Sequence, residues 1–438
     1  MRKTLPTGDT AAIQGRLGAV ALVCFLGSAP VHAQTMDEMR DELKRLRAEV
    51  NELRRVKAAE EASTAAKPAD SAGWGDRIKS LEAKSKDAVV PDDAGLGLRL
   101  PGSGTSLRIY GQAEAHAIHD FRQSGSPDLF TDLTFQPLDN AGGQKGKTKF
   151  TAETSRFGFE TSTPIGTNTF KTKVEADFYS YRADNRNRVR LRQAYGEYGG
   201  WLIGQTWSTF MDLDDLPETV DFNGPIGAPF SRRAMVRYSF GDAKTGYKFT
   251  FAAEDPEDQF GGGSANERMP QLVARIDKSF DSGAVNARVL AHEKRSFSQV
   301  KRGFGIGVGG SYKLSDKDLI MGQYTRVDGD VDQLYGSNGY AVDADTGNIT
   351  FDKNQGLVLG YARTFTSLLR GSVVLGLNRG RTAQAVNNRT LSQLFVNLIY
   401  SPIKNVELGG ELILGKRKTF DGEPGTLSRF DLMARYSF

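Results

Sequence analysis

The feature that most constrains this chain is the one-by-one alternation of apolar and polar residues between about Thr105 and Phe438. In the segment 170–178, the even positions carry Phe, Thr, Val, Ala and Phe, and the odd positions carry Lys, Lys, Glu and Asp. A period of two predicts β-strands with one apolar face and one polar face. On the same rule, Leu191 and Tyr195 are expected on the apolar face of a strand, opposite Arg190 and Arg192.

The length of these segments separates a membrane barrel from a soluble sandwich. They run for roughly 9–15 residues, as needed to cross a bilayer at a tilt, whereas soluble strands usually have about five or six residues. Lipid offers no hydrogen bonds, so all backbone groups must pair within a closed ring. The sequence therefore predicts an all-β fold, a transmembrane antiparallel β-barrel of about 16 strands. The number of strands is even if the chain enters and leaves the barrel on the periplasmic side.

The connections between the predicted strands alternate in length. Short connections are expected at 164–168, 199–200, 241–246, 281–283, 314–317, 366–368 and 401–405, and longer polar segments at 122–147, 210–231, 255–267, 328–350, 381–388 and 418–425. Short turns on one side and longer loops on the other are typical of outer-membrane barrels. The last strand ends in an aromatic residue, Phe438, which resembles the C-terminal signal of outer-membrane proteins.

The N-terminus has the layout of an export signal. Basic residues precede an apolar stretch from Leu17 to Leu26, and cleavage after Ala33 would remove residues 1–33. The stretch is too short for a transmembrane anchor. Cys24, the only cysteine, lies inside it, so the mature chain would contain no disulfide and no cysteine nucleophile. Lipidation of Cys24 is the weaker alternative.

A helical prefix is expected before the barrel. Residues 34–57 contain a heptad pattern of Met, Leu and Val with charged residues between them, which predicts a coiled-coil oligomerisation segment. A helix packing on its own chain is the alternative. Residues 58–104 read as a linker in which Trp74, Ile78 and Leu81 indicate one short helix, and residues 105–438 form the predicted barrel domain.

Several function classes are disfavoured by the sequence. Lys and Arg number 57 against 53 Asp and Glu, and the two kinds are interleaved, which does not favour nucleic acid binding. The four histidines are scattered, and we find no serine nucleophile motif, phosphate loop or zinc spacing. The sequence predicts no catalytic residue, metal or cofactor. An outer-membrane hydrolase and a plugged adhesive barrel remain as alternatives of other classes.

The polar phase of the strands supplies candidate pore-lining residues. Predicted to face the lumen and to bind anionic solutes are Lys171, Lys173, Arg190, Arg192, Arg233, Arg237, Arg275 and Arg288. The guanidinium groups of the arginines bind carboxylates in pairs of hydrogen bonds and so favour anions. The alternative is that these arginines only solvate the wall or pair with Glu175 and Asp177.

The long segment around 210–231 follows the fifth predicted strand. If this segment folds inward, it becomes a constriction loop whose acids face the arginine wall and create a transverse field. Its acidic residues are Asp212, Asp214, Asp215, Glu218 and Asp221. An ordinary external loop is the alternative. A second acidic segment, 328–345, lacks the full calcium-loop pattern and is expected to be a surface loop.

Four segments of the chain together resemble the DcaP-like porin family. They read SRFGFE at 155–160, RLRQAY at 190–195, GQTWSTF at 204–210 and PETVDF at 217–222. The likeness covers nearly all of the mature chain, and the Gly-Gln-Thr-Trp and Pro-Glu-Thr segments are its most specific parts. It implies a homotrimer of sixteen-stranded outer-membrane barrels with a periplasmic coiled coil, and uptake of small anionic solutes such as dicarboxylates. Lipopolysaccharide contact is expected from this location. Phosphate-selective porins are the nearest alternative.

Overall fold

The computed structural model describes the barrel almost completely. It covers residues 48, 51–52, 54–55, 90–91, 97–100, 103–122, 129–142, 145–179, 188–258, 267–382 and 388–438. The predicted export signal lies outside these residues, and so does most of the predicted coiled coil and linker, although residues 48, 51–52 and 54–55 are helical. The chain divides into two units, Met1–Asp87 and Ala88–Phe438. Among the described residues, no helix is long and apolar enough to cross a membrane.

A single antiparallel sheet closes on itself in the second unit. In its described part the sheet has nineteen strands. Two of these, β1 (Val90–Pro91) and β2 (Leu98–Arg99), are two-residue strands before the barrel, and β4 (Lys147–Thr151) and β5 (Arg156–Ile165) both pair with β3 (Ser106–Asp120) as one interrupted strand. Sixteen wall strands result, which confirms the prediction.

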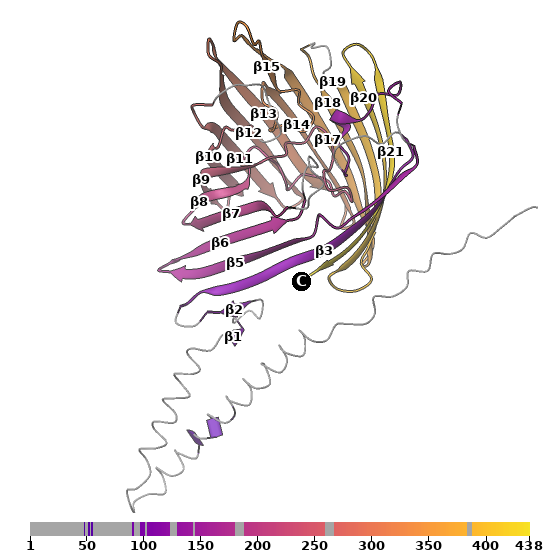
Figure 1. Ribbon diagram of the computed structural model, residues 1–438. Helices are drawn as coiled ribbons and strands as arrows, with labels where there is room; N and C mark the ends of the chain where they lie inside the picture. The colour runs from indigo at the N-terminus through magenta and orange to yellow at the C-terminus, as the bar shows by residue number, and fades with distance from the viewer. Residues whose placement is uncertain are drawn as a thin grey trace, which may run out of the picture. The chain divides into compact units, whose positions relative to one another are not determined.

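The remaining wall strands follow one another around the ring in chain order, as the colours of Figure 1 show. They are β6 (Asn168–Asp177), β7 (Arg190–Tyr198), β8 (Trp201–Trp207), β9 (Arg232–Asp242), β10 (Tyr247–Glu254), β11 (Gln271–Phe280), β12 (Gly283–Arg295), β13 (Val300–Lys313), β14 (Asp318–Asp328), β17 (Lys353–Thr366), β18 (Leu369–Arg379), β19 (Asn388–Tyr400), β20 (Val406–Thr419) and β21 (Pro424–Ser437). Pairing of β21 with β3, from Arg429↔Asp120 to Ser437↔Gln112, closes the ring. A small hairpin, β15 (Tyr340–Val342) and β16 (Ile349–Phe351), lies in the loop after β14.

The two ends of the barrel differ as predicted. Short turns connect the strands at 166–167, 199–200, 243–246, 281–282, 314–317, 367–368 and 401–405, all at one end. Phe438 lies at this end too, where its backbone exchanges two hydrogen bonds with Gly111. The longer connections are at the other end. In outer-membrane barrels the short-turn end faces the periplasm and the long-loop end faces the outside of the cell.

The two faces of the wall also differ as predicted. On β13, Phe304, Ile306 and Val308 point outward and are 53%, 44% and 53% exposed. The glycines between them face inward and are buried. On β6, Glu175 and Asp177 are buried on the inner face. The barrel thus has an apolar outside and a polar inside, which is the arrangement that a lipid environment requires.

One strand departs from the simple alternation. The register between β6 and β7 shifts between Glu175 and Ala176, so that Arg192 is an extra residue of a β-bulge. An extra residue reverses the phase of everything that follows it. Tyr195 was predicted on the apolar face, but it pairs with Lys173 and lies on the inner face. That prediction was wrong because it assumed that apolar and polar positions alternate without interruption, and such an assumption does not include a bulge.

We predict a depth-dependent cost for a charge on the outer face of β13. Val308→Arg places the guanidinium in the middle of the apolar belt and should lower the free energy of unfolding by roughly 2–4 kcal/mol. Tyr312→Arg, on the same face near the short-turn end, should cost at most about 1 kcal/mol. Urea titration in lipid bilayers measures both. Equal costs at the two positions would contradict the assignment of the outer face.

Candidate functional site

The loop 208–231, between β8 and β9, lies inside the barrel. Its backbone N–H groups at Val220 and Asp221 donate to the carboxylate of Glu411 on β20, at 2.9 and 2.8 Å. Further along, the N–H of Ile226 donates to Gln393 on β19 at 2.9 Å. At its other end, Asp212 accepts from Asn286 on β12 at 2.7 Å. The loop therefore follows the inner wall from β12 to β20.

Glycines on the inner face of the wall make room for this loop. A methyl group on Gly376 would lie 2.5 Å from the carbonyl oxygen of Ile226, and one on Gly409 would lie 2.9 Å from Val220. Methyl groups on Gly309, Gly356 and Gly360 would collide with Asp212, Gly227 and Pro217 respectively. The wall is shaped to the loop along most of its course, so the loop is a fixed part of the lumen.

Two of the predicted lumen arginines bind the loop directly. Arg275 donates to the carbonyl of Met211 at 2.7 Å and to the carboxylate of Asp212 at 3.2 Å. Arg288 is fully buried, donates to the carbonyl of Phe210 at 3.0 Å, and lies 3.9 Å from Asp212. Charges in such close contact largely cancel. These arginines are on the inner face, where they position the loop and are covered by it.

The predicted basic patch on β7 is paired with carboxylates of β6. Arg190 makes a forked pair with Asp177 at 3.0 and 2.7 Å, and its side chain remains 32% exposed. Arg192 donates to Glu175 at 2.6 Å and to Asp177 at 2.7 Å. This is the alternative that the sequence left open, and it makes the patch nearly neutral.

Two predicted pore-lining residues lie in other surroundings. Arg233 is fully buried and donates to the carbonyls of Asp255 and Glu257 and to the carboxylate of Asp332, so it holds two outer loops together. Lys173 lies 3.0 Å from Glu160. Neither is an open cation of the lumen.

Arg156 and Arg237 are lumen cations without a direct ion pair in the described part of the chain, although Glu175 and Glu114 act on Arg156, and Glu254 and Glu197 on Arg237, at longer range. Both are on the inner face, and among the described residues neither makes an ion pair or a hydrogen bond. Lys171, on the same arc, is exposed and makes no ion pair within the described part. Arg156 was missed in the sequence analysis, although it shares the polar phase with Glu160 and opposes Phe157 and Phe159.

The acids of the loop have different partners, and Asp212 and Glu218 are the two that lie in close ion pairs within the described residues. Glu218 makes a forked pair with Arg370 on β18, at 2.8 Å for both bonds. Asp215 accepts from Asn286 at 2.9 Å. Asp214 is exposed and has no ion pair among the described residues. The transverse field expected between open acids and open arginines is therefore weakened, because Asp212 and Glu218 are paired and Asp214 is the exposed acid of the loop.

Asp221 connects the loop to a second loop. Its carboxylate accepts from the N–H and hydroxyl of Thr131, both at 2.9 Å, and from the N–H of Asn223 at 3.0 Å. Burial raises its pKa to about 6, and the Asp431 carboxylate adds to this, while Arg429 opposes it. The sequence could not have predicted the partner Thr131, which lies 90 residues away.

The loop also reaches the opposite arc of the wall. Phe222 packs against Tyr179, with ring centroids 5.0 Å apart, and Arg190 and Arg192 each lie 5.8 Å from its ring. The chain segment around Asp221 and Phe222 thus connects β20 with β7 and narrows the lumen between them.

A further polar cluster on β3, β20 and β21 was missed by the sequence analysis. His116 lies 3.0 Å from Asp431 and 3.1 Å from Glu114, and Arg435 pairs with both Glu114 and Glu407. These residues share the polar phase of their strands, so the alternation could have identified them. With three carboxylates against one guanidinium and one imidazole, this part of the wall carries no excess of positive charge.

The second acidic segment has a structural role. Asp332 pairs with Arg233 at 3.0 Å, and Asp330 accepts from the N–H groups of Asp332 and Gln333 at 2.9 and 2.8 Å. In the described part of the chain, no group of His, Cys, Asp or Glu is arranged to hold a metal ion.

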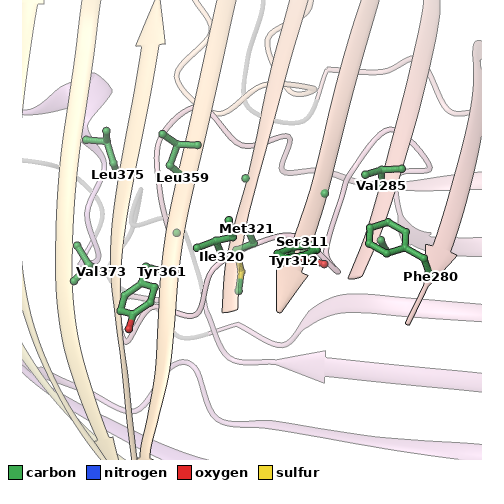
Figure 2. A pocket seen from close by; sticks show the side chains of 14 residues that line it. Phe280, Val285, Ser311, Tyr312, Ile320, Met321, Leu359, Tyr361, Val373 and Leu375 are labelled. Atoms are coloured by element: carbon green, nitrogen blue, oxygen red, sulfur yellow. The ribbon is translucent and has the colours of Figure 1, made fainter. Parts of the chain in front are cut away.

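The outer wall carries apolar hollows that do not belong to the solute path. One of about 620 Å³ lies over β11 to β18 and is lined by side chains such as Val285, Tyr312, Ile320 and Leu359. Figure 2 shows these side chains on neighbouring strands of the wall. The hollow forms where small residues, among them Gly310 and Gly322, face the lipid.

Comparison with known proteins identifies the family. The sequence profile of the DcaP outer membrane protein family matches residues 98–438. The chain belongs to this family. The comparison with curated protein sequences gave no match. The protein is thus an outer membrane channel protein of the DcaP family, as the sequence predicted.

Solved structures agree with this assignment. The outer membrane channel DcaP of Acinetobacter baumannii is 29% identical, with a TM-score of 0.71, over 80% of this chain and all of that one. An anion-selective porin from Comamonas acidovorans is 12% identical, with a TM-score of 0.52, over 76% of this chain and all of that one. Salmonella typhi OmpF in complex with daunomycin is 15% identical, with a TM-score of 0.54, over 76% of this chain and 98% of that one. The last two share the fold.

We predict that a side chain added to the glycine surface beneath the loop displaces the loop and makes it more mobile. Gly376→Ala sets a methyl group against the backbone of Ile226 and should lower the free energy of unfolding by about 1–3 kcal/mol and increase open-channel current noise. Gly410→Ala is the control, because its methyl group would meet no atom closer than 3.6 Å, on the outer face. Urea titration and single-channel recording measure the two effects. Identical behaviour of the two variants would show that the loop does not rest on this wall.

We also predict a pH-dependent contribution of Asp221. Because its folded pKa is raised to about 6, its proton is bound more tightly in the folded state, and stability increases as pH falls from about 7 to 4. The difference in unfolding free energy between the wild type and Asp221→Asn should shift by roughly 2–3 kcal/mol in favour of the wild type over that range. Thermal or urea unfolding at stepped pH measures it. A difference that is constant with pH would contradict a buried, proton-binding carboxyl.

Proposed function

We propose that the protein is a passive diffusion channel that prefers small anionic solutes, dicarboxylates among them. The observation that supports this is the excess of basic over acidic side chains on one arc of the lumen, β5 to β9. There, basic side chains outnumber carboxylates on the inner face, and Arg156 and Arg237 have no ion partner in the described part of the chain. Unpaired guanidinium groups offer forked donors to a carboxylate.

The arc that the loop covers adds little charge of its own. From β14 to β19 the inner face is covered by the loop and is built mainly of glycine, asparagine, glutamine and apolar residues. Of the loop's own acids, Asp212 pairs with Arg275 and Glu218 pairs with Arg370. Field lines are concentrated in a narrow, low-dielectric passage, so a small excess of charge is enough to select ions. Solutes pass down their gradient, and selectivity comes from charge and from the width beside the loop.

The proposal includes the assembly and location that the family resemblance implies. The channel would be a homotrimer in the Gram-negative outer membrane, with residues 34–57 as a periplasmic coiled coil. One neighbour in fold, OmpT of Vibrio cholerae, is described in a trimer form, at 13% identity. Coiled-coil stubs of about three heptads are marginal alone, so this segment would reinforce an association that the barrels already have.

The direct test removes the two lumen arginines that make no ion pair in the described part of the chain. Arg156→Gln combined with Arg237→Gln takes two positive charges from the lumen and leaves no buried carboxylate unpaired. In planar bilayers under a salt gradient, the reversal potential should move clearly toward cation preference. Arg302→Gln, on the outer face of β13, is the matched control and should leave it unchanged. An unchanged reversal potential in the double variant, or a wild type without conductance, would overturn the proposal.

A second pair of substitutions separates paired from unpaired arginines. Arg190→Ala with Arg192→Ala exposes Glu175 and Asp177 as well as removing two cations. The shift should therefore exceed that of Arg156→Gln with Arg237→Gln. Succinate flux into proteoliposomes should fall in the same order, while flux of a neutral sugar of similar size should not change. Equal sugar and succinate losses would indicate a narrowed pore in place of altered charge selection.

A further inference from the structure

A group of basic side chains projects outward at the extracellular ends of the wall strands between β12 and β20, with β19 as the one strand that contributes none. We call it the basic collar. It consists of Arg295 on β12, Arg302 on β13, Arg326 on β14, Lys353 on β17, Arg379 on β18, and Lys416 and Lys418 on β20. Each has the same phase as the apolar residues of the outer face. Arg302, for example, continues the row of Phe304 and Ile306. All of these strands have a mainly apolar outer face below the collar.

Much of the collar's charge is not cancelled within the protein. Arg302 lies 3.7 Å from Glu293 and is 80% exposed, and Arg326 lies 3.3 Å from Asp328. The side chains of Lys353, Arg379, Lys416 and Lys418 make no ion pair in the part of the chain that the structure describes. Exposed and unpaired cations at the extracellular edge of the apolar belt are the groups that meet the headgroup layer of a membrane.

The collar has a spacing suited to paired phosphates. Arg379 is opposite Thr390 of β19, and Thr390 is opposite Lys418 of β20. Arg379 and Lys418 are therefore two strand spacings apart, about 10 Å. A lipid that carries a phosphate at each end of a disaccharide headgroup can place one phosphate near each of these residues. Arginine and lysine both bind phosphate through charge-assisted hydrogen bonds.

The opposite arc of the barrel shows that the collar is not a uniform feature. At the extracellular ends of β4, β6 and β7, the outer face carries large apolar side chains. Phe150, Phe178 and Val189 are 77%, 37% and 64% exposed. A ring of charge needed only for solubility would encircle the barrel, whereas the outward-facing cations at this end of the described strands lie on the arc from β12 to β20. The asymmetry indicates a specific neighbour on that arc.

We propose that the basic collar binds the phosphate groups of lipopolysaccharide in the outer leaflet. The occupant is the phosphorylated glycolipid itself, because the collar lies at the boundary between the apolar belt and the outside, where its acyl chains contact the wall and its phosphates contact the cations. An acidic protein would bind above this boundary and would not use the apolar wall beneath it. The site is outside the lumen, so it does not depend on the proposed anion preference.

The test compares two triple charge reversals at opposite ends of the barrel. Lys353→Glu, Arg379→Glu and Lys418→Glu together reverse the collar. Lys313→Glu, Lys317→Glu and Lys404→Glu reverse three exposed cations at the short-turn end and serve as the matched control. The probe is purified diphosphoryl lipid A, with monophosphoryl lipid A and a zwitterionic phospholipid as comparisons. Binding to the full-length protein is measured by native mass spectrometry in detergent.

The wild type and the control should bind diphosphoryl lipid A with equal affinity, and more tightly than monophosphoryl lipid A. The collar variant should bind it at least about tenfold more weakly, from the loss of three favourable charges. Single-channel conductance should be the same in all three proteins, which shows that they are folded and separates this test from the test of anion preference. If the collar variant does not fold, Lys353→Gln, Arg379→Gln and Lys418→Gln together should give a smaller loss. Equal lipid A binding by the collar variant and the control variant would overturn the proposal. So would a wild type that binds the zwitterionic phospholipid as tightly as diphosphoryl lipid A.

Discussion

The structure depends on one constraint, that every backbone N–H and C=O of a lipid-exposed wall must find its partner inside the protein. Antiparallel pairing satisfies this from β3 around to β21, and the pairing of β21 with β3 removes the last free edge. Once the ring is closed, the strand period of two sends alternate side chains to lipid and to water. The apolar belt, the polar lumen and the ion pairs across neighbouring strands all follow from this geometry.

The second organising relation is between the loop 208–231 and the wall that it covers. Where the loop lies, the wall has glycines in place of large side chains and amides or buried arginines in place of open charge. The remaining arc keeps the polar lining that water and solutes meet. The loop thus divides the lumen into a filled half and a charged half, and this division makes one arc the candidate for solute selection. The outer face shows a division of its own, with the basic collar on β12 to β20.

The sequence predicted the class of fold, the number of wall strands and the two kinds of connection, because all three are set by local alternation and length. It also placed the loop correctly after the fifth wall strand. It failed where an effect was not periodic or not local. The bulge at Arg192 turned Tyr195 to the other face, and the partners of Arg190, Arg233 and Asp221 come from other strands or distant loops. The inner-face glycines of β13, at every second position, were visible in the sequence, but their purpose is clear only with the loop in place.

The most direct test of the two-faced wall is labelling of single cysteines along β7 with a water-soluble thiol reagent in lipid bilayers. Cys24, inside the predicted export signal, is the only native cysteine, so each introduced thiol can be followed alone. The wall predicts labelling at 190, 193, 195 and 197 and protection at 191, 194 and 196, with the phase changing at the bulge. Labelling at 194 and 196 with protection at 195, which is the phase of 190 and 192 continued without a bulge, would contradict it. Labelling without any alternation would contradict it too.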